Sequence, residues 1–177
     1  MPGFYRIHKI SAFAIAVLIS ACDPPVQKQT TPQQDQQSEQ FVKANQYMQR
    51  RHQDHIAAFV ERVKWDARVT PSGLWLVEKK PGSGPEIELN SKVTYSFESM
   101  LLDGTPCYEA TDEKPKVITI GIGGVESGVE QGLQLMRQGT EAILLIPPHL
   151  AHGNFGDRDK IPGNRVLIYH VKVLEVQ

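Results

Sequence analysis

The segment from residue 125 to residue 163 constrains the fold of this chain more than any other. Its apolar residues at positions 129, 133 and 136 share one helix face, which predicts a short helix over residues 128–136. The apolar run over residues 140–146 predicts a buried strand, which the two following prolines end. Residues 147–163 have no periodicity and contain three glycines. We interpret them as a flap over a pocket, because long loops without secondary structure are usually functional or disordered.

Strand signals lie on both sides of this segment. Residues 74–79, 93–99, 117–120 and 165–176 are apolar or alternating runs, and each run predicts a strand. Asp103 followed by Gly104 indicates a hairpin turn. Many strands with one short helix among them predict an α+β fold, in which a twisted antiparallel β-sheet wraps around the helix.

The first 21 residues resemble a secretory signal. A basic region over residues 6–9 precedes an apolar run over residues 10–20, which is shorter than the roughly 20 residues that span a bilayer. The sequence Ile-Ser-Ala-Cys, which ends at Cys22, resembles the lipobox in which the cysteine becomes acylated. The alternative is an ordinary secretory signal with a chance cysteine. We predict a membrane-anchored lipoprotein of the cell envelope that faces the periplasm.

Three further regions follow the signal. Residues 22–40 are rich in Gln, Pro and Thr, and this composition predicts a flexible tether. Residues 41–69 carry apolar side chains at three- and four-residue steps, which predicts an amphipathic N-terminal helical segment. This helix either packs on its own domain or serves as an arm for homodimerisation or client binding. Residues 70–177 form the predicted globular domain.

Composition argues against several function classes. The formal net charge is −1 and the basic residues are scattered, so no nucleic-acid partner is predicted. No hydrolase or nucleotide-binding motif occurs. The histidine pairs 52/55 and 149/152 lack a nearby Cys or acidic partner, so we expect no metal and no cofactor. With Cys22 acylated, Cys107 is predicted to be a free thiol that lines or flanks the pocket.

A resemblance to a known family rests on the order and spacing of the residues around the predicted helix and flap. They are Val125-Glu126, Gly128, Glu130, Gly132-Leu133, Met136, Gly139, Ile146-Pro147, Gly153, Gly156 and Ile161-Pro162. This pattern resembles the FKBP-type peptidyl-prolyl cis-trans isomerases, over roughly residues 71–177. The resemblance implies isomerisation of Xaa-Pro bonds in exported, proline-containing polypeptides.

The resemblance also implies a site. Its catalytic residues would be Phe97, Val125, Glu126, His152 and Tyr169, and its substrate-binding residues Cys107, Tyr108, Val129, Phe155 and Ile161. Several of these positions depart from the family pattern. Phe97 stands for a tyrosine, Cys107-Tyr108 for a Phe-Asp pair, Glu126 for an isoleucine, Val129 for a tryptophan, His152 for a flap tyrosine and Tyr169 for a phenylalanine. The backbone N–H of Glu126 would still bind a substrate carbonyl.

These departures leave two functions open. The first is an isomerase whose activity is low because the pocket is degenerate. The second is a non-catalytic client-binding or assembly module. The tyrosine at position 108 is also typical of FKBP-like lipoproteins associated with gliding motility, a subgroup that this sequence resembles.

The lipobox-like segment gives a first prediction. Cys22→Ser should release the protein from the membrane fraction or block its maturation, because the acylated side chain is lost. Fractionation and the mass of the mature chain test this. A variant that fractionates with membranes at an unchanged mature mass would contradict lipidation.

Overall fold

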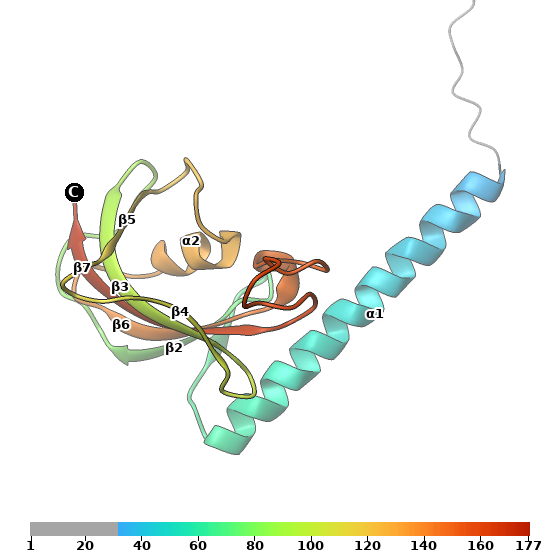
Figure 1. Cartoon of the computed structure of the whole chain (residues 1–177), viewed down its shortest axis with the longest axis horizontal. Coiled ribbons are helices and arrows are strands. Elements are labelled where there is room, and N and C mark those ends of the chain that lie inside the picture. The colour runs from blue at the N-terminus through green and yellow to red at the C-terminus, as the bar shows by residue number, and fades with distance from the viewer. Residues whose placement is uncertain (1–31) are drawn as a thin grey trace, which may run out of the picture.

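The computed structural model describes residues 32–177, with side chains from residue 38 onward, and shows one curved antiparallel sheet with helices on both of its faces (Figure 1). The predicted signal at residues 1–21, Cys22 and the first part of the predicted tether lie outside the described residues. The elements are α1 (Pro32–Val63), β1 (Arg68–Val69), β2 (Trp75–Lys80), β3 (Lys92–Leu101), β4 (Pro106–Ala110), β5 (Lys116–Thr119), α2 (Ser127–Leu133), β6 (Glu141–Ile146), the 3-10 helix η1 (Pro148–Leu150) and β7 (Leu167–Val176). The sheet has seven strands in the order β1-β2-β6-β7-β3-β4, and β5 also pairs with β3. The predicted α+β fold is confirmed.

Helix α2 packs into the concave face of the sheet through two glycines. Gly128 lies against Ile146 and Gly132 against Leu144, and a Cβ atom at either glycine would overlap these side chains. The helix therefore approaches β6 as closely as its backbone allows. Between α2 and the sheet lies the larger apolar core, which includes Val129 and Leu133 of the helix.

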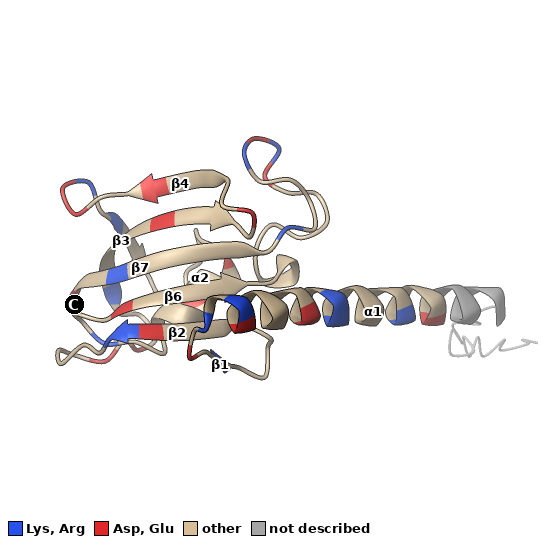
Figure 2. Ribbon diagram, turned by 90° about the horizontal axis from the view of Figure 1, so that it is seen from below, with Lys and Arg blue, Asp and Glu red and all other residues tan. Residues whose placement is uncertain are grey.

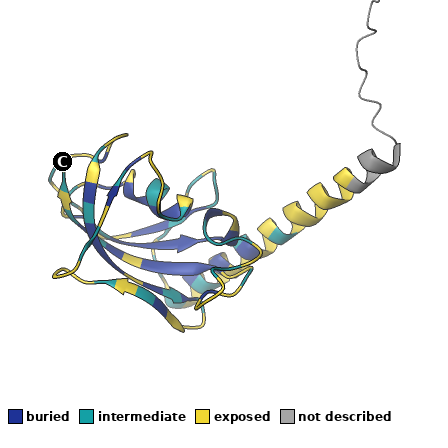
Figure 3. Ribbon diagram, turned by 45° about the horizontal axis from the view of Figure 1, so that its top comes forward, coloured by how far each residue is buried: buried dark blue, intermediate teal, exposed yellow. Residues whose placement is uncertain are grey.

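Strand β6 is buried on both faces, and this explains its continuous apolar run. Leu144 and Ile146 point to α2, whereas Ile143 and Leu145 belong to a second core on the opposite face. The C-terminal half of α1 covers that second core with Ile56, which is 0% exposed, and with Val60. Figure 3 shows this end of α1 buried against the sheet. A strand covered by helices on both sides needs no polar face.

The N-terminal half of α1 projects away from the sheet. The side chains of residues 38–47 are exposed, including Phe41 at 64% and Tyr47 at 62% (Figure 3). Acidic and basic residues are interspersed along the described part of α1 and across the sheet (Figure 2). The C-terminal half of α1 packs on the domain, as one of the two predicted alternatives states, and a role of the N-terminal half in homodimerisation or client binding stays a prediction. Within residues 32–177, no helix combines the length and apolarity that a membrane span requires.

Several element boundaries differ from the sequence prediction. Helix α1 begins at Pro32, inside the segment predicted as a tether, and ends at Val63, because Lys64 has a φ of 55°. Helix α2 ends at Leu133 rather than at residue 136, because Leu135 and Met136 donate to carbonyls three residues earlier. Strand β4 and the short strand β1 were not predicted. The flap contains η1, so it has a short element of its own.

The second core gives a stability prediction. Ile56→Ala should lower the free energy of unfolding by about 2–5 kcal/mol, because it removes buried methyl groups and leaves a cavity. Phe41→Ala, on the exposed half of the same helix, should change it by less than about 0.5 kcal/mol. Urea unfolding of both variants measures the difference. Equal losses would show that α1 does not anchor through Ile56.

Candidate functional site

A cavity of about 700 Å³ opens between the concave face of the sheet, the start of α2 and the flap. Residues from β3, β4, β5, β7 and two loops line it. They are Phe97, Tyr108, Glu109, Ala110, Lys116, Gly124, Val125, Glu126, Ala151, His152, Asp157 and Tyr169. Six of the ten predicted site residues are among them, namely Phe97, Tyr108, Val125, Glu126, His152 and Tyr169. The topology thus brings together residues that are up to 72 positions apart (97 to 169).

Two stacked aromatic rings form one wall of the cavity. Phe97 on β3 and Tyr169 on β7 have ring centroids 5.1 Å apart, and Tyr95 lies 5.8 Å from Phe97. The strands pair directly, and alternation turns these side chains to the concave face. Offset aromatic stacks of this kind hold each other in place and exclude water.

Glu126 occupies the N-cap position of α2 and presents two groups to the cavity. Its backbone N–H donates to no acceptor among the described residues, which leaves it available to a ligand. Its carboxylate does not cap the helix. Instead, Oε1 accepts hydrogen bonds from the Tyr169 hydroxyl at 2.7 Å and from His152 Nε2 at 2.9 Å. Burial, and then the nearby Glu126 carboxylate, raise the pKa of Tyr169, so its hydroxyl remains protonated and donates.

The flap is also held to β4 by a second polar contact. The Tyr108 hydroxyl donates to Asp157 Oδ2 at 2.5 Å, and Lys160 lies 5.0 Å from the Tyr108 ring centroid. Burial would raise the pKa of Asp157, but hydrogen bonds from Tyr108 and from the backbone N–H groups of Asp159 and Ile161 outweigh it and lower this pKa to about 2. The Asp157 carboxylate is therefore charged at neutral pH. The flap closes over the cavity through two anchors, His152 and Asp157.

Four predicted site residues lie outside the lining of this cavity. Val129 is fully buried in the core under the helix, and Ile161 is buried in the same core. Phe155 is 85% exposed at the flap surface. Cys107 is a free, buried thiol that lines a neighbouring hollow, and burial raises its pKa.

Sequence reasoning missed other lining residues, among them Asp157, Lys116 and Glu109. Asp157 had a turn signal, because Asp157 and Asp159 flank an arginine in a glycine-containing loop. Its partner Tyr108 lies 49 positions away, and no local pattern reports such a contact. Lys116 and Glu109 had no signal that separates them from ordinary surface residues.

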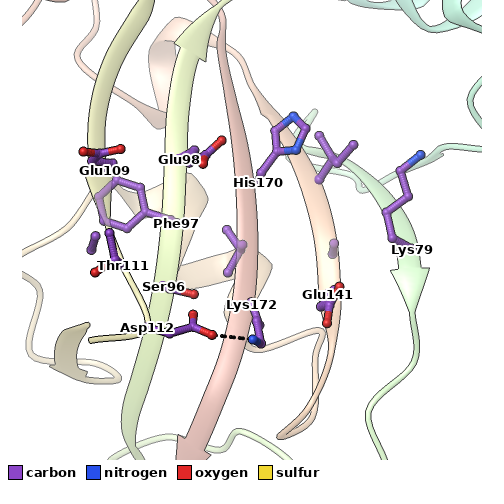
Figure 4. A pocket seen from close by; sticks show the side chains of 14 residues that line it. Lys79, Ser96, Phe97, Glu98, Glu109, Thr111, Asp112, Glu141, His170 and Lys172 are labelled. Carbon is purple, nitrogen blue, oxygen red and sulfur yellow. Dashed lines mark hydrogen bonds and ion pairs between the residues drawn. The ribbon is translucent and has the colours of Figure 1, made fainter. Parts of the chain in front are cut away.

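A second hollow, of about 430 Å³, lies on the outer face of the sheet (Figure 4). Its labelled side chains are mostly charged or polar, and Lys172 Nζ is 2.5 Å from Asp112 Oδ2. Charges paired across an open sheet surface provide no enclosed apolar surface for a ligand. No cluster of three or more His, Cys, Asp or Glu residues that would suit a metal occurs within residues 32–177.

Comparisons with known proteins agree with this geometry. A family model described as FKBP-type peptidyl-prolyl cis-trans isomerase matches residues 84–174. FK506-binding protein 4 of Mycosarcoma maydis is 38% identical over 110 residues, which are 60% of this chain and 28% of that protein. FkpA of Buchnera aphidicola subsp. Schizaphis graminum, an isomerase of this type by its name, is 31% identical over 109 residues, which are 61% of this chain and 42% of that protein. The chain thus spans less than half the length of these curated relatives.

Solved structures show the same similarity. The crystal structure of FkpA from Escherichia coli superimposes with a TM-score of 0.60 at 25% identity, covering 84% of this chain and 74% of that one. A peptidyl-prolyl cis-trans isomerase from Pseudomonas syringae pv. tomato gives a TM-score of 0.61 at 25% identity, covering 72% and 95% respectively.

The flap anchor predicts a dependence of stability on pH. The pKa of Asp157 in the folded chain, about 2, lies below its ordinary value of 3.8. Its contribution to stability is therefore complete above about pH 4 and is lost as the pH falls toward 2. Asp157→Asn should be less stable than the wild type at pH 7, and this difference should shrink between pH 4 and pH 2. Urea unfolding across this range measures it.

Asp66→Asn is the matched control, since Asp66 is exposed and has no hydrogen bond or ion pair in the described part of the chain. The free energy of unfolding of Asp66→Asn should change with pH in the same way as that of the wild type. A wild type and an Asp157→Asn variant that differ by a constant amount down to pH 2 would contradict the proposed anchor.

Proposed function

The chain belongs to the FKBP-type peptidyl-prolyl cis-trans isomerase family, and we propose that it catalyses the cis–trans isomerisation of Xaa-Pro bonds in exported polypeptides. The observation that carries this proposal is the free backbone N–H of Glu126 beside the stacked rings of Phe97 and Tyr169. One hydrogen-bond donor and one apolar wall are the groups that this reaction requires.

The chemistry needs no nucleophile. Rotation about the amide C–N bond has a barrier of about 18–20 kcal/mol, because resonance keeps the peptide planar. A twisted amide has lost this resonance. Its oxygen therefore carries less negative charge than the oxygen of a planar amide, and its nitrogen becomes pyramidal. A cavity that removes water and holds the carbonyl in a twisted orientation binds this state better than the planar one, which accelerates rotation. The proline ring packs on the aromatic wall, and the Glu126 N–H orients the carbonyl.

The departures from the family pattern support a low activity. Val129 stands where the family has a tryptophan, and its side chain lies in the core rather than in the cavity. Cys107 likewise points into a separate hollow. The aromatic wall is therefore reduced to Phe97, Tyr169 and the ring of Tyr108. This reduction also favours the second candidate, a non-catalytic module that binds or assembles client proteins.

We further propose a place in the cell envelope. Lipidation at Cys22 would anchor the chain to a membrane facing the periplasm, where exported polypeptides fold. Tyr108 and the lipobox-like segment support membership in the lipoprotein subgroup that resembles gliding-motility-associated proteins. Exposed Phe41, Val42 and Tyr47 on the free half of α1 support a homodimer through this helix.

The aromatic wall gives the test of the proposed activity. Tyr169→Ala and Phe97→Ala should each lower kcat/KM by about one to two orders of magnitude, because burying an aromatic ring contributes about 1.5–3 kcal/mol and about 1.4 kcal/mol corresponds to a factor of ten. His152→Phe should lower it less if His152 only covers the cavity, and equally if it donates to the substrate. Exchange spectroscopy on a proline peptide measures these rates.

Tyr47→Ala, which removes an exposed ring from α1, serves as the control and should leave the rate per chain unchanged. All variants must retain the circular dichroism spectrum of the wild type. A wild-type chain that does not accelerate isomerisation, yet binds unfolded polypeptides, would replace the enzymatic proposal with the client-binding one.

A further inference from the structure

The carboxylate of Glu126 has a second oxygen that the protein does not use. Oε1 accepts the two hydrogen bonds from Tyr169 and His152, whereas Oε2 accepts none within the described residues. No solvent-inaccessible side-chain oxygen in this part of the chain lacks a partner. Oε2 must therefore be reached by the solvent in the cavity, although the side chain as a whole is only 14% exposed.

No fixed positive charge neutralises this carboxylate. The Tyr169 hydroxyl is neutral, and its raised pKa keeps it so. His152 is charged only when it is protonated, and in its neutral form it donates a hydrogen bond without cancelling the charge. Besides Glu126, the lining of the described cavity includes the carboxylate of Asp157 and the ammonium group of Lys116, whereas the side chain of Glu109 lies in the hollow on the outer face of the sheet (Figure 4). Glu126, Asp157 and Lys116 together carry a formal net charge of −1 with His152 neutral.

A largely buried carboxylate with an accessible oxygen favours a cation. Clefts lined by one sign of charge concentrate the opposite sign, and a partly enclosed site screens this attraction less than open water does. A neutral or anionic ligand group near Oε2 would instead lose water without gaining an opposite charge. The cation must also lie close to the reacting bond, since the same residue provides the N–H for the substrate carbonyl.

We infer that Glu126 determines substrate specificity and selects proline segments in which a lysine or arginine lies next to the proline. This inference rests on the proposed isomerase function of the cavity. The backbone of Glu126 orients the amide, and its side chain pairs with the neighbouring cationic residue. The isoleucine that the family pattern has at this position offers no charge for such a pair.

The Glu126 carboxylate also holds Tyr169 and His152 in place. This positioning role and the proposed selection of substrates by charge predict different results. A residue that only positions the wall and the flap would affect every substrate to the same extent. A residue that selects by charge changes the ratio between cationic and anionic substrates. Glu126→Gln separates the roles, because the glutamine oxygen still accepts a hydrogen bond from Tyr169 whereas the charge is lost.

The experiment measures kcat/KM of the full chain by exchange spectroscopy on matched peptides that contain Lys-Pro, Leu-Pro or Glu-Pro, and on the same set with the residue after the proline varied. The wild type should prefer the lysine peptide over the glutamate peptide by about two- to fivefold at low salt, and less at high salt. Glu126→Gln should bring this ratio near one. The control Glu61→Gln, on the exposed surface of α1, should keep it.

Lys116→Gln provides a second variant should Glu126→Gln not fold. It removes the cation from the lining, so the preference for lysine should increase. An unchanged ratio in the folded Glu126→Gln variant, or equal rates of the wild type on all peptides, would overturn the inference.

The proposed function and this inference fail in different ways. Should no peptide be isomerised, the proposed activity is wrong. The affinities of the wild type and of Glu126→Gln for fluorescently labelled forms of these peptides then test the charge preference alone. Tighter binding of the lysine peptide that depends on Glu126 would support selection by charge, and equal or absent binding would reject it.

Discussion

The close packing of α2 against β6 determines where the site lies. Gly128 and Gly132 let the helix backbone rest on Ile146 and Leu144, and this contact fixes the position of the residue that precedes the helix. That residue, Glu126, then lies within hydrogen-bond distance of Tyr169 on the neighbouring strand β7. A side chain at either glycine would push the helix off the sheet and move the free N–H away from the ring stack. The geometry of the cavity thus depends on glycine at both of these positions.

Where the polar residues of the cavity depart from the family pattern, they form hydrogen bonds with one another. A carboxylate at Glu126 would be unfavourable alone in a partly buried wall, but the added hydroxyl of Tyr169 and the histidine at position 152 both donate to it. The Phe-Asp pair of the family becomes Cys107-Tyr108, and the missing carboxylate is supplied by Asp157 from the flap, which binds the Tyr108 hydroxyl. The polar side chains at these positions therefore have hydrogen-bond partners, although the aromatic wall is smaller than the family pattern implies.

The sequence was informative wherever one periodicity extended over a whole element. The run over residues 140–146 predicted β6, and the alternation after residue 165 predicted β7, because burial on one or two faces leaves a regular pattern. The start of α1 was missed because its first residues are too polar to suggest packing, although glutamine and glutamate favour helices. The short β4, Pro-Cys-Tyr-Glu-Ala, has no clear alternation. The links of Tyr108 to Asp157 and of Glu126 to Tyr169 join distant positions, and only the fold brings them together.

Only the C-terminal half of α1 packs on the sheet, so the N-terminal half extends the chain over a defined distance. Ile56 fastens the helix to the sheet, and Pro32 begins it 24 residues earlier. At about 1.5 Å per residue, this stretch holds position 32 roughly 36 Å from the point of attachment. A continuous helix keeps its two ends at a nearly fixed distance, whereas the distance between the ends of a random coil varies widely. An anchor at Cys22, as proposed, would therefore be separated from the cavity by at least the length of this rigid helix, which would also limit the orientations of the cavity relative to the anchor.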